Sequence, residues 1–223
     1  MKHWTKASLA KSIDHTLLKA IAAERQVKEH CSEARAYGFF GICVNPVWVP
    51  LCVKELAGSG VAVCTVVGFP LGANDPTTKA EEARRAVGQG AVEIDMVINV
   101  GAVKAGNWKA VEEDIRGVVA ASGSAGVKVI LETCYLSEAE KSQACEAAIR
   151  ADARYVQTST GFGTGGASVE DIRLLRKTIG DRARRIKASG GIRTYHDAIL
   201  LLGAGADRIG ASSGVAIVSE LPE

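Results

Sequence analysis

The chain has 223 residues, of which 47% are hydrophobic and 23% charged, and its formal net charge is only +2. A chain of this size can bury a sizeable core, and its scattered basic residues favour neither nucleic acid nor a membrane surface as a partner. No segment approaches the roughly 20 apolar residues of a membrane span, and residues 1–6 lack the long apolar stretch of a signal peptide. The six cysteines form no CxxC pair and no Cys/His ligand spacing, so we expect a cytoplasmic protein without structural disulfides or zinc. We also expect no metal and no cofactor.

Short apolar, β-branched segments recur along the chain, and stretches with helical spacing lie between them. In chain order the predicted strands are 12–16, 39–44, 61–67, 92–99, 127–133, 154–159, 185–188 and 207–209. Helices are predicted around 23–37, from Pro76 with Asp75 as N-cap, from about Asn107, after Ser137 and after Ser168. Glu140 and Asp171 stand three residues after the two serines, a spacing typical of capping boxes.

Strands that are apolar on both faces and alternate with helices predict a parallel sheet covered by helices. Eight such strands close a barrel, so we expect an α/β protein of the (β/α)8 or TIM-barrel class, with residues 1–223 as one domain. The rival is an open doubly wound sheet. Its G-x-G-x-x-G signature does not follow the first strand, and the glycine-rich segment 161–166 follows the sixth instead.

Polar residues within apolar strands are the candidates for chemistry, because strand carboxyl ends carry the active site of a barrel. Lys187, between Ile186 and Ala188, is predicted to be the only strand lysine that points inward. Burial would lower its pKa toward neutrality, and Asp95 could complete a proton-relay pair with it. A purely structural ion pair is the alternative for both residues.

Three glycine-rich turns follow the last three strands, at 161–166, 189–193 and 210–214. Glycines let backbone N–H groups aim at one oxyanion, and serine hydroxyls add donors. We therefore predict a phosphate site there, although simple tight turns would also explain single glycine pairs.

These residues belong to a longer pattern that resembles the deoxyribose-phosphate aldolases of the short bacterial type. The matching segments are Ile13-Asp14-His15-Thr16, Ile42-Cys43-Val44-Asn45-Pro46, Val66-Val67-Gly68-Phe69-Pro70-Leu71-Gly72, Glu93-Ile94-Asp95-Met96-Val97-Ile98-Asn99, Lys128-Val129-Ile130-Leu131-Glu132-Thr133-Cys134, Thr158-Ser159-Thr160-Gly161-Phe162 and Ile186-Lys187-Ala188-Ser189-Gly190-Gly191. The resemblance implies metal-free, reversible cleavage of 2-deoxy-D-ribose 5-phosphate to D-glyceraldehyde 3-phosphate and acetaldehyde through a lysine Schiff base. It also implies that Asp95 and Lys187 are a proton-relay pair, and it makes a homodimer plausible. The substrate-binding residues it suggests are Asp14, Thr16, Cys43, Thr158, Gly161, Gly190, Gly191, Arg193, Gly210, Ser212 and Ser213.

One position departs from the family. The resemblance places the Schiff-base lysine immediately before Thr-Ser-Thr-Gly, and this chain has Gln157 there. A primary amide has no basic lone pair and forms no iminium, so we expect a catalytically impaired form that still binds the sugar phosphate. The alternatives are that Lys187 serves as the nucleophile, or that the chain is a non-catalytic sugar-phosphate-binding paralogue.

Overall fold

The computed structural model describes residues 4–221, so residues 1–3 of the segment inspected for a signal peptide lie outside the described part. Eight parallel strands form a closed barrel in sequence order, with β1 paired to both β2 and β8. The strands are β1 (Ile13–Leu17), β2 (Gly41–Val44), β3 (Ala62–Val67), β4 (Glu93–Val97), β5 (Gly126–Ile130), β6 (Tyr155–Gln157), β7 (Arg185–Ser189) and β8 (Arg208–Ala211). The predicted (β/α)8 class is confirmed.

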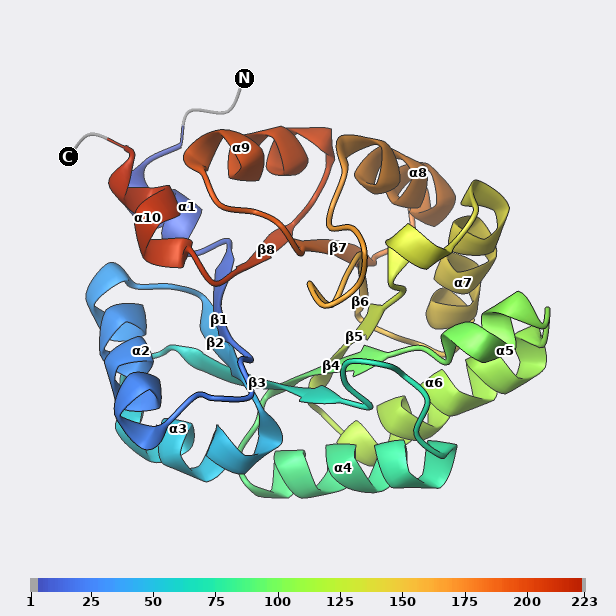
Figure 1. The fold of residues 1–223 in the computed structure, drawn as a ribbon, viewed down its shortest axis with the longest axis horizontal. Coiled ribbons are helices and arrows are strands. Elements are labelled where there is room, and N and C mark those ends of the chain that lie inside the picture. Colours follow the sequence, from blue (N-terminus) through green and yellow to red (C-terminus); the bar gives the residue numbers. More distant parts are fainter. Residues whose placement is uncertain (1–3, 222–223) are drawn as a thin grey trace.

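Helices surround the barrel as an outer ring (Figure 1). The α-helices are α1 (Lys6–Ala10), α2 (Glu24–Tyr37), α3 (Val49–Glu55), α4 (Pro76–Gly88), α5 (Val100–Lys104), α6 (Trp108–Ser122), α7 (Glu138–Arg150), α8 (Val169–Ile179), α9 (Tyr195–Ala204) and α10 (Gly214–Ser219), and the 3-10 turns are η1 (Pro46–Trp48) and η2 (Thr133–Tyr135). No helix within residues 4–221 is long and apolar enough to cross a membrane.

The local start signals act as predicted at three of the helices. Asp75 accepts a hydrogen bond from Thr77 N, and Ser137 and Glu140 form the reciprocal capping box of α7. Ser168 caps α8, but the prediction of a capping box there is wrong, because the Asp171 carboxylate pairs with Lys141 at 2.6 Å instead. The sequence patterns also left α1, α3, α5, α9 and α10 unassigned.

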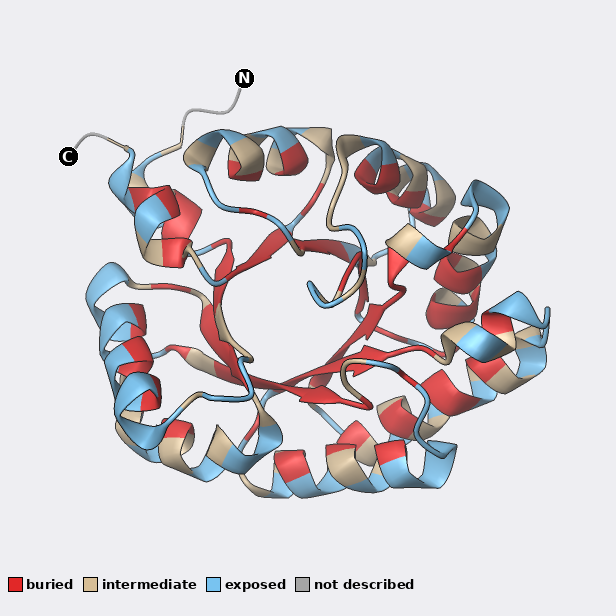
Figure 2. Cartoon of the chain, viewed as in Figure 1, coloured by how far each residue is buried: buried red, intermediate tan, exposed pale blue. Residues whose placement is uncertain are grey.

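The core lies between the barrel and its helices. Side chains that point outward from the strands, such as Ile42, Val129 and Ile186, are fully buried beneath the helices. Figure 2 shows the strands as an almost continuously buried ring and each helix as buried on its inner face only. The side chains that alternate with this apolar set point into the barrel, and many of them are charged.

Candidate active site

A pocket of about 290 Å³ opens among the loops that follow the strands, at the barrel's carboxyl-terminal mouth. Predicted residues from six different strands or the turns after them reach its wall: Thr16, Cys43, Asp95, Gln157, Gly161, Lys187, Gly190, Gly191, Arg193, Gly210 and Ser212. Parallel strands bring these positions together because their carboxyl ends all point to one face.

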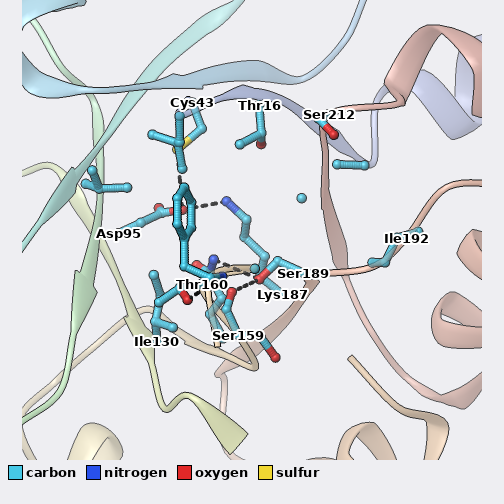
Figure 3. A pocket seen from close by; sticks show the side chains of 18 of the residues that line it. Thr16, Cys43, Asp95, Ile130, Ser159, Thr160, Lys187, Ser189, Ile192 and Ser212 are labelled. Carbon is cyan, nitrogen blue, oxygen red and sulfur yellow. Dashed lines mark hydrogen bonds and ion pairs between the residues drawn. The ribbon is translucent and has the colours of Figure 1, made fainter. Parts of the chain in front are cut away.

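Lys187 and Asp95 meet in the wall of this pocket, as Figure 3 shows. Lys187 Nζ donates to Asp95 Oδ2 at 2.6 Å and lies 2.7 Å from Asp14 Oδ2, and all three side chains are buried. Burial alone would lower the pKa of Lys187, but the charges of Asp14 and Asp95 outweigh burial and raise that pKa above its ordinary value. The expectation of a near-neutral Lys187 pKa is therefore wrong, since its two carboxylate partners stabilise the ammonium form.

A second inward lysine lies on the other side of Asp95. Lys128 Nζ is 2.7 Å from Asp95 Oδ1 and 2.7 Å from Glu93 Oε2, and the side chain is fully buried. The prediction that Lys187 is the only inward strand lysine is wrong. Val127-Lys128-Val129 shows the same alternation as Ile186-Lys187-Ala188, and this pattern could have revealed Lys128.

Asp95 is held between two ammonium groups. Burial pushes the pKa of this carboxyl upward, but the charges of Lys128 and Lys187 outweigh the burial, so the pKa lies below its ordinary value. A carboxylate that accepts from both sides keeps its position and its charge. Asp95 therefore presents a fixed anion at the pocket, and Lys187 is the ammonium group beside it.

Gln157 ends β6 and pairs in register with Lys187 of β7. Its Nε2 donates to Ser189 Oγ at 3.0 Å, and Ser189 Oγ donates its own proton to Ser159 O at 2.5 Å. Because the serine proton is used in this way, Ser189 can only accept from the amide, which fixes the amide orientation. Gln157 Oε1 is buried and has no hydrogen-bond partner among the described residues.

The last two glycine turns also border the pocket. Gly190 has φ +88°, and a Cβ there would approach Ser159 Cβ to 3.1 Å and Gly166 Cα to 3.2 Å. Only glycine fits this junction, where the loops after β6 and β7 touch. Arg193, Gly210 and Ser212 also border the pocket and add a cation, backbone and a hydroxyl.

Asp14, Thr158 and Ser213 lie outside the pocket wall. Asp14 sits deeper in the barrel, 2.7 Å from both Lys187 Nζ and Arg208 Nη1. Thr158 Oγ1 donates to Ser189 O and accepts from Ser189 N, and Ser213 precedes α10.

Sequence reasoning assigned no role to three notable side chains: Arg208, Phe69 and Phe162. The two phenylalanines border the pocket, and only their position after strand ends could have indicated this.

Two groups of side chains within residues 4–221 have donor atoms close enough to suggest a metal site. Asp14 and Glu93 already pair with the cations of Lys128 and Arg208, and the Cys64 thiol donates to Glu93 Oε2 at 3.3 Å. His15 and His30 are stacked near Glu33 with ring centroids 3.6 Å apart, and the Glu33 carboxylate already pairs with His15 Nε2 at 2.8 Å. In both groups, side chains of the protein already occupy donor atoms that an ion would need.

Comparisons with known proteins agree with this architecture. Residues 8–220 match the family described as "DeoC/LacD family aldolase". A deoxyribose-phosphate aldolase of Geobacillus sp. strain WCH70 is 57% identical over 212 residues, covering 95% of each chain, and one of Carboxydothermus hydrogenoformans is 53% identical over 217 residues, covering 96% of this chain and 95% of the relative. The solved deoxyribose phosphate aldolase of Aeropyrum pernix, described as tetrameric, superposes with a TM-score of 0.91 at 35% identity, covering 97% of this chain and 92% of that one. An eight-stranded barrel, a polar pocket at its mouth and this degree of identity over nearly the whole length place the chain in the DeoC/LacD family of aldolases.

Proposed function

We propose that this chain is a deoxyribose-phosphate aldolase by descent that binds 2-deoxy-D-ribose 5-phosphate but cleaves it poorly. The observation that carries the proposal is Gln157, which lies in the pocket wall next to Lys187 at the position where the family resemblance expects the Schiff-base lysine. The rest of the site retains the proton-relay pair and the glycine turns.

The covalent route needs a free amine at position 157. An amine attacks the substrate carbonyl carbon and loses water to form an iminium, which accepts the electron pair of the breaking carbon–carbon bond. An amide nitrogen shares its lone pair with its own carbonyl, so Gln157 supplies no such nucleophile. It can still donate or accept hydrogen bonds, which supports ligand binding without turnover.

The relay role that we assign to Asp95 and Lys187 is consistent with their charges. Lys187 as an ammonium can donate a proton to a leaving or attacking oxygen, and Asp95 keeps it oriented. Lys187 would also depress the pKa of an amine introduced at position 157, because two ammonium groups on adjacent strands repel each other. We further assign the phosphate to Gly190, Gly191, Arg193, Gly210 and Ser212, with Ser213 shaping the same turn.

The deciding experiment is Gln157→Lys, assayed by retro-aldol cleavage of 2-deoxyribose 5-phosphate. We expect the substitution to raise kcat by at least about 100-fold, within the range that covalent and acid–base groups contribute. Borohydride reduction with substrate should then trap one adduct at position 157 in the mass spectrum. A folded variant without added activity would contradict the role proposed for this position.

Two alternatives have distinct outcomes in the same assays. If Lys187 were the nucleophile, borohydride would trap an adduct on Lys187 in the unsubstituted chain. The raised pKa of Lys187 argues against this, since its amine remains protonated. If the chain were a non-catalytic binding paralogue, Asp95→Asn in the Gln157→Lys background would leave its measured function unchanged, whereas a relay role predicts loss of turnover.

The remaining assignments are part of the same proposal. We infer that residues 1–223 form one domain, that the protein acts in the cytoplasm on a small phosphorylated sugar, and that it forms a homodimer. Light scattering at several concentrations tests the last point, and a stable monomer or tetramer would overturn it.

A further inference from the structure

Glu132, directly after β5, has an unusual backbone conformation. Its φ of +54° and ψ of 62° are in the left-handed region, which is rare for residues other than glycine, and the residue is only 3% exposed. A left-handed residue of this kind is strained and persists only where surrounding contacts hold it.

Those contacts go to the loop after β6. Glu132 Oε1 accepts from Thr160 N at 3.2 Å, and Glu132 Oε2 accepts from the Thr160 hydroxyl. Thr160 Oγ1 in turn accepts from Phe162 N at 3.0 Å. Since the one hydroxyl proton goes to the carboxylate, the lone pairs remain free for Phe162, and the three residues form one directed chain. We call this chain of hydrogen bonds the Glu132–Thr160 clasp.

The clasp holds an aromatic side chain over the pocket. Phe162 contacts Phe69 edge to face, with ring centroids 5.3 Å apart and an interplanar angle of 86°. Phe69 follows β3 and Phe162 follows β6, strands that are separated by β4 and β5 in the barrel, so the contact spans part of the mouth. Both rings border the pocket, yet Phe162 is 57% exposed. Such a ring is placed for contact with a ligand rather than for the core.

The loop after β6 is also packed closely against its neighbours at Gly163 and Gly166. A Cβ at Gly163 would lie 3.1 Å from Glu132 Cδ, and one at Gly166 would lie 2.2 Å from Gly190 O. The loop therefore has direct contact with Glu132 at one side and with the turn after β7 at the other. If the Glu132 carboxylate moved, Phe162 would therefore shift more than the glycine turns after β7 and β8, because separate strands hold those turns.

We propose that Glu132 is a positioning residue that, through Thr160, holds Phe162 against Phe69 as a cover over the sugar part of the bound sugar phosphate. This inference rests on the proposed function, since it assigns a part of the same pocket. It predicts that the clasp contributes to binding of the carbon skeleton and not to binding of the phosphate group.

Calorimetric titration of the unsubstituted protein, which carries Gln157, with two different ligands separates these contributions. We expect inorganic phosphate to occupy only the turns after β7 and β8, whereas 2-deoxyribose 5-phosphate should also contact the cover. In Glu132→Gln and in Thr160→Val, we expect Kd for the sugar phosphate to rise about tenfold, the effect of one lost charge-assisted hydrogen bond. Kd for phosphate should stay within about twofold of the parent value, because the residues to which we assign the phosphate do not belong to the clasp.

Further variants keep the test informative if one protein folds poorly. Phe162→Ala removes the exposed ring itself and should repeat the selective loss, whereas Thr160→Ser retains the hydroxyl and should keep the parent affinity. Glu138→Gln, an exposed glutamate at the start of α7, is the matched control and should change neither Kd.

Each contrary outcome has one meaning. Equal loss of affinity for both probes would make Glu132 a merely structural residue, and unchanged affinity for both would leave the clasp without a role in binding. Either would overturn this inference while leaving the proposed function intact. Failure of the parent chain to bind 2-deoxyribose 5-phosphate at all would overturn both.

Discussion

The imidazoles of His15 and His30 lie stacked between β1 and α2, and both side chains are buried. Burial lowers the pKa of each to about 4, and the nearby His15 ring also disfavours a charge on His30. His15 Nδ1 and His30 Nε2 have no hydrogen-bond partner among the described residues. Both rings are therefore neutral in the folded protein at pH 7.

This pair predicts a specific loss of stability in weak acid. The folded-state pKa values lie below the ordinary value of 6.5, so the unfolded chain binds protons first as the pH falls. Stability is complete above about pH 6.5 and is lost toward pH 4, by roughly 2 kcal/mol per histidine at pH 5. His30→Leu should about halve the drop in unfolding free energy between pH 7 and pH 5, measured by urea denaturation. His196→Leu, at an exposed position of α9, is the control, and an equal effect there would contradict the assignment.

At the level of the elements, the turn from β3 to α4 depends on one glycine. Gly72 has φ +68°, and a Cβ there would lie 1.8 Å from Ile98 O, just past the end of β4. This turn carries Phe69 and leads from β3 into α4. Its close approach to the backbone after β4 leaves room for a hydrogen atom only.

Gly72→Ala should therefore destabilise the protein by about 2 kcal/mol or more, because the backbone must shift and the left-handed conformation is strained. Thermal or urea unfolding measures the loss. Gly88→Ala provides the matched control, since nothing lies within 4 Å of a Cβ at that position at the end of α4. That variant should be neutral or slightly more stable, and similar losses in both variants would contradict the packing argument.

Across the whole molecule, the barrel interior carries charges in place of a purely apolar filling. Lys128, Lys187 and Arg208 are interleaved with Asp14, Glu93 and Asp95, at distances from 2.6 to 3.6 Å. The charges balance, and they come from strands β1, β4, β5, β7 and β8. A network of this kind is stable only while each ion has its counter-ion.

Removal of one cation should therefore affect the entire barrel. Lys128→Met leaves Glu93 and Asp95 short of a partner, and we expect a loss of about 3–5 kcal/mol in unfolding free energy. Guanidinium unfolding of Lys128→Met and of Lys109→Met, whose lysine side chain is 85% exposed, measures the contrast. A loss below 1 kcal/mol in Lys128→Met would show that the interior charges do not depend on one another.

The amino-acid sequence by itself determined the succession of strands and helices, and with it the barrel. The alternation of apolar and polar residues, the glycine turns and helix caps such as Asp75 and Ser137 are local signals. Each depends only on residues a few positions away in the chain. The order of polar residues at strand ends likewise indicated Asp95, Lys187 and the glycine turns as pocket residues. Helices α3 and α10 have only seven and six residues, fewer than two full turns, so too few positions repeat for the patterns to reveal them.

Only the tertiary structure decided how those side chains are paired. Asp95 and Lys187 are 92 residues apart, and the direction of the Lys187 pKa depends on two carboxylates that no local pattern connects to it. The same holds for Lys128 beneath Asp95 and for the Glu132–Thr160 clasp. Electrostatic and hydrogen-bond energies depend on distances of a few ångströms between remote segments, and barrel closure is what sets those distances.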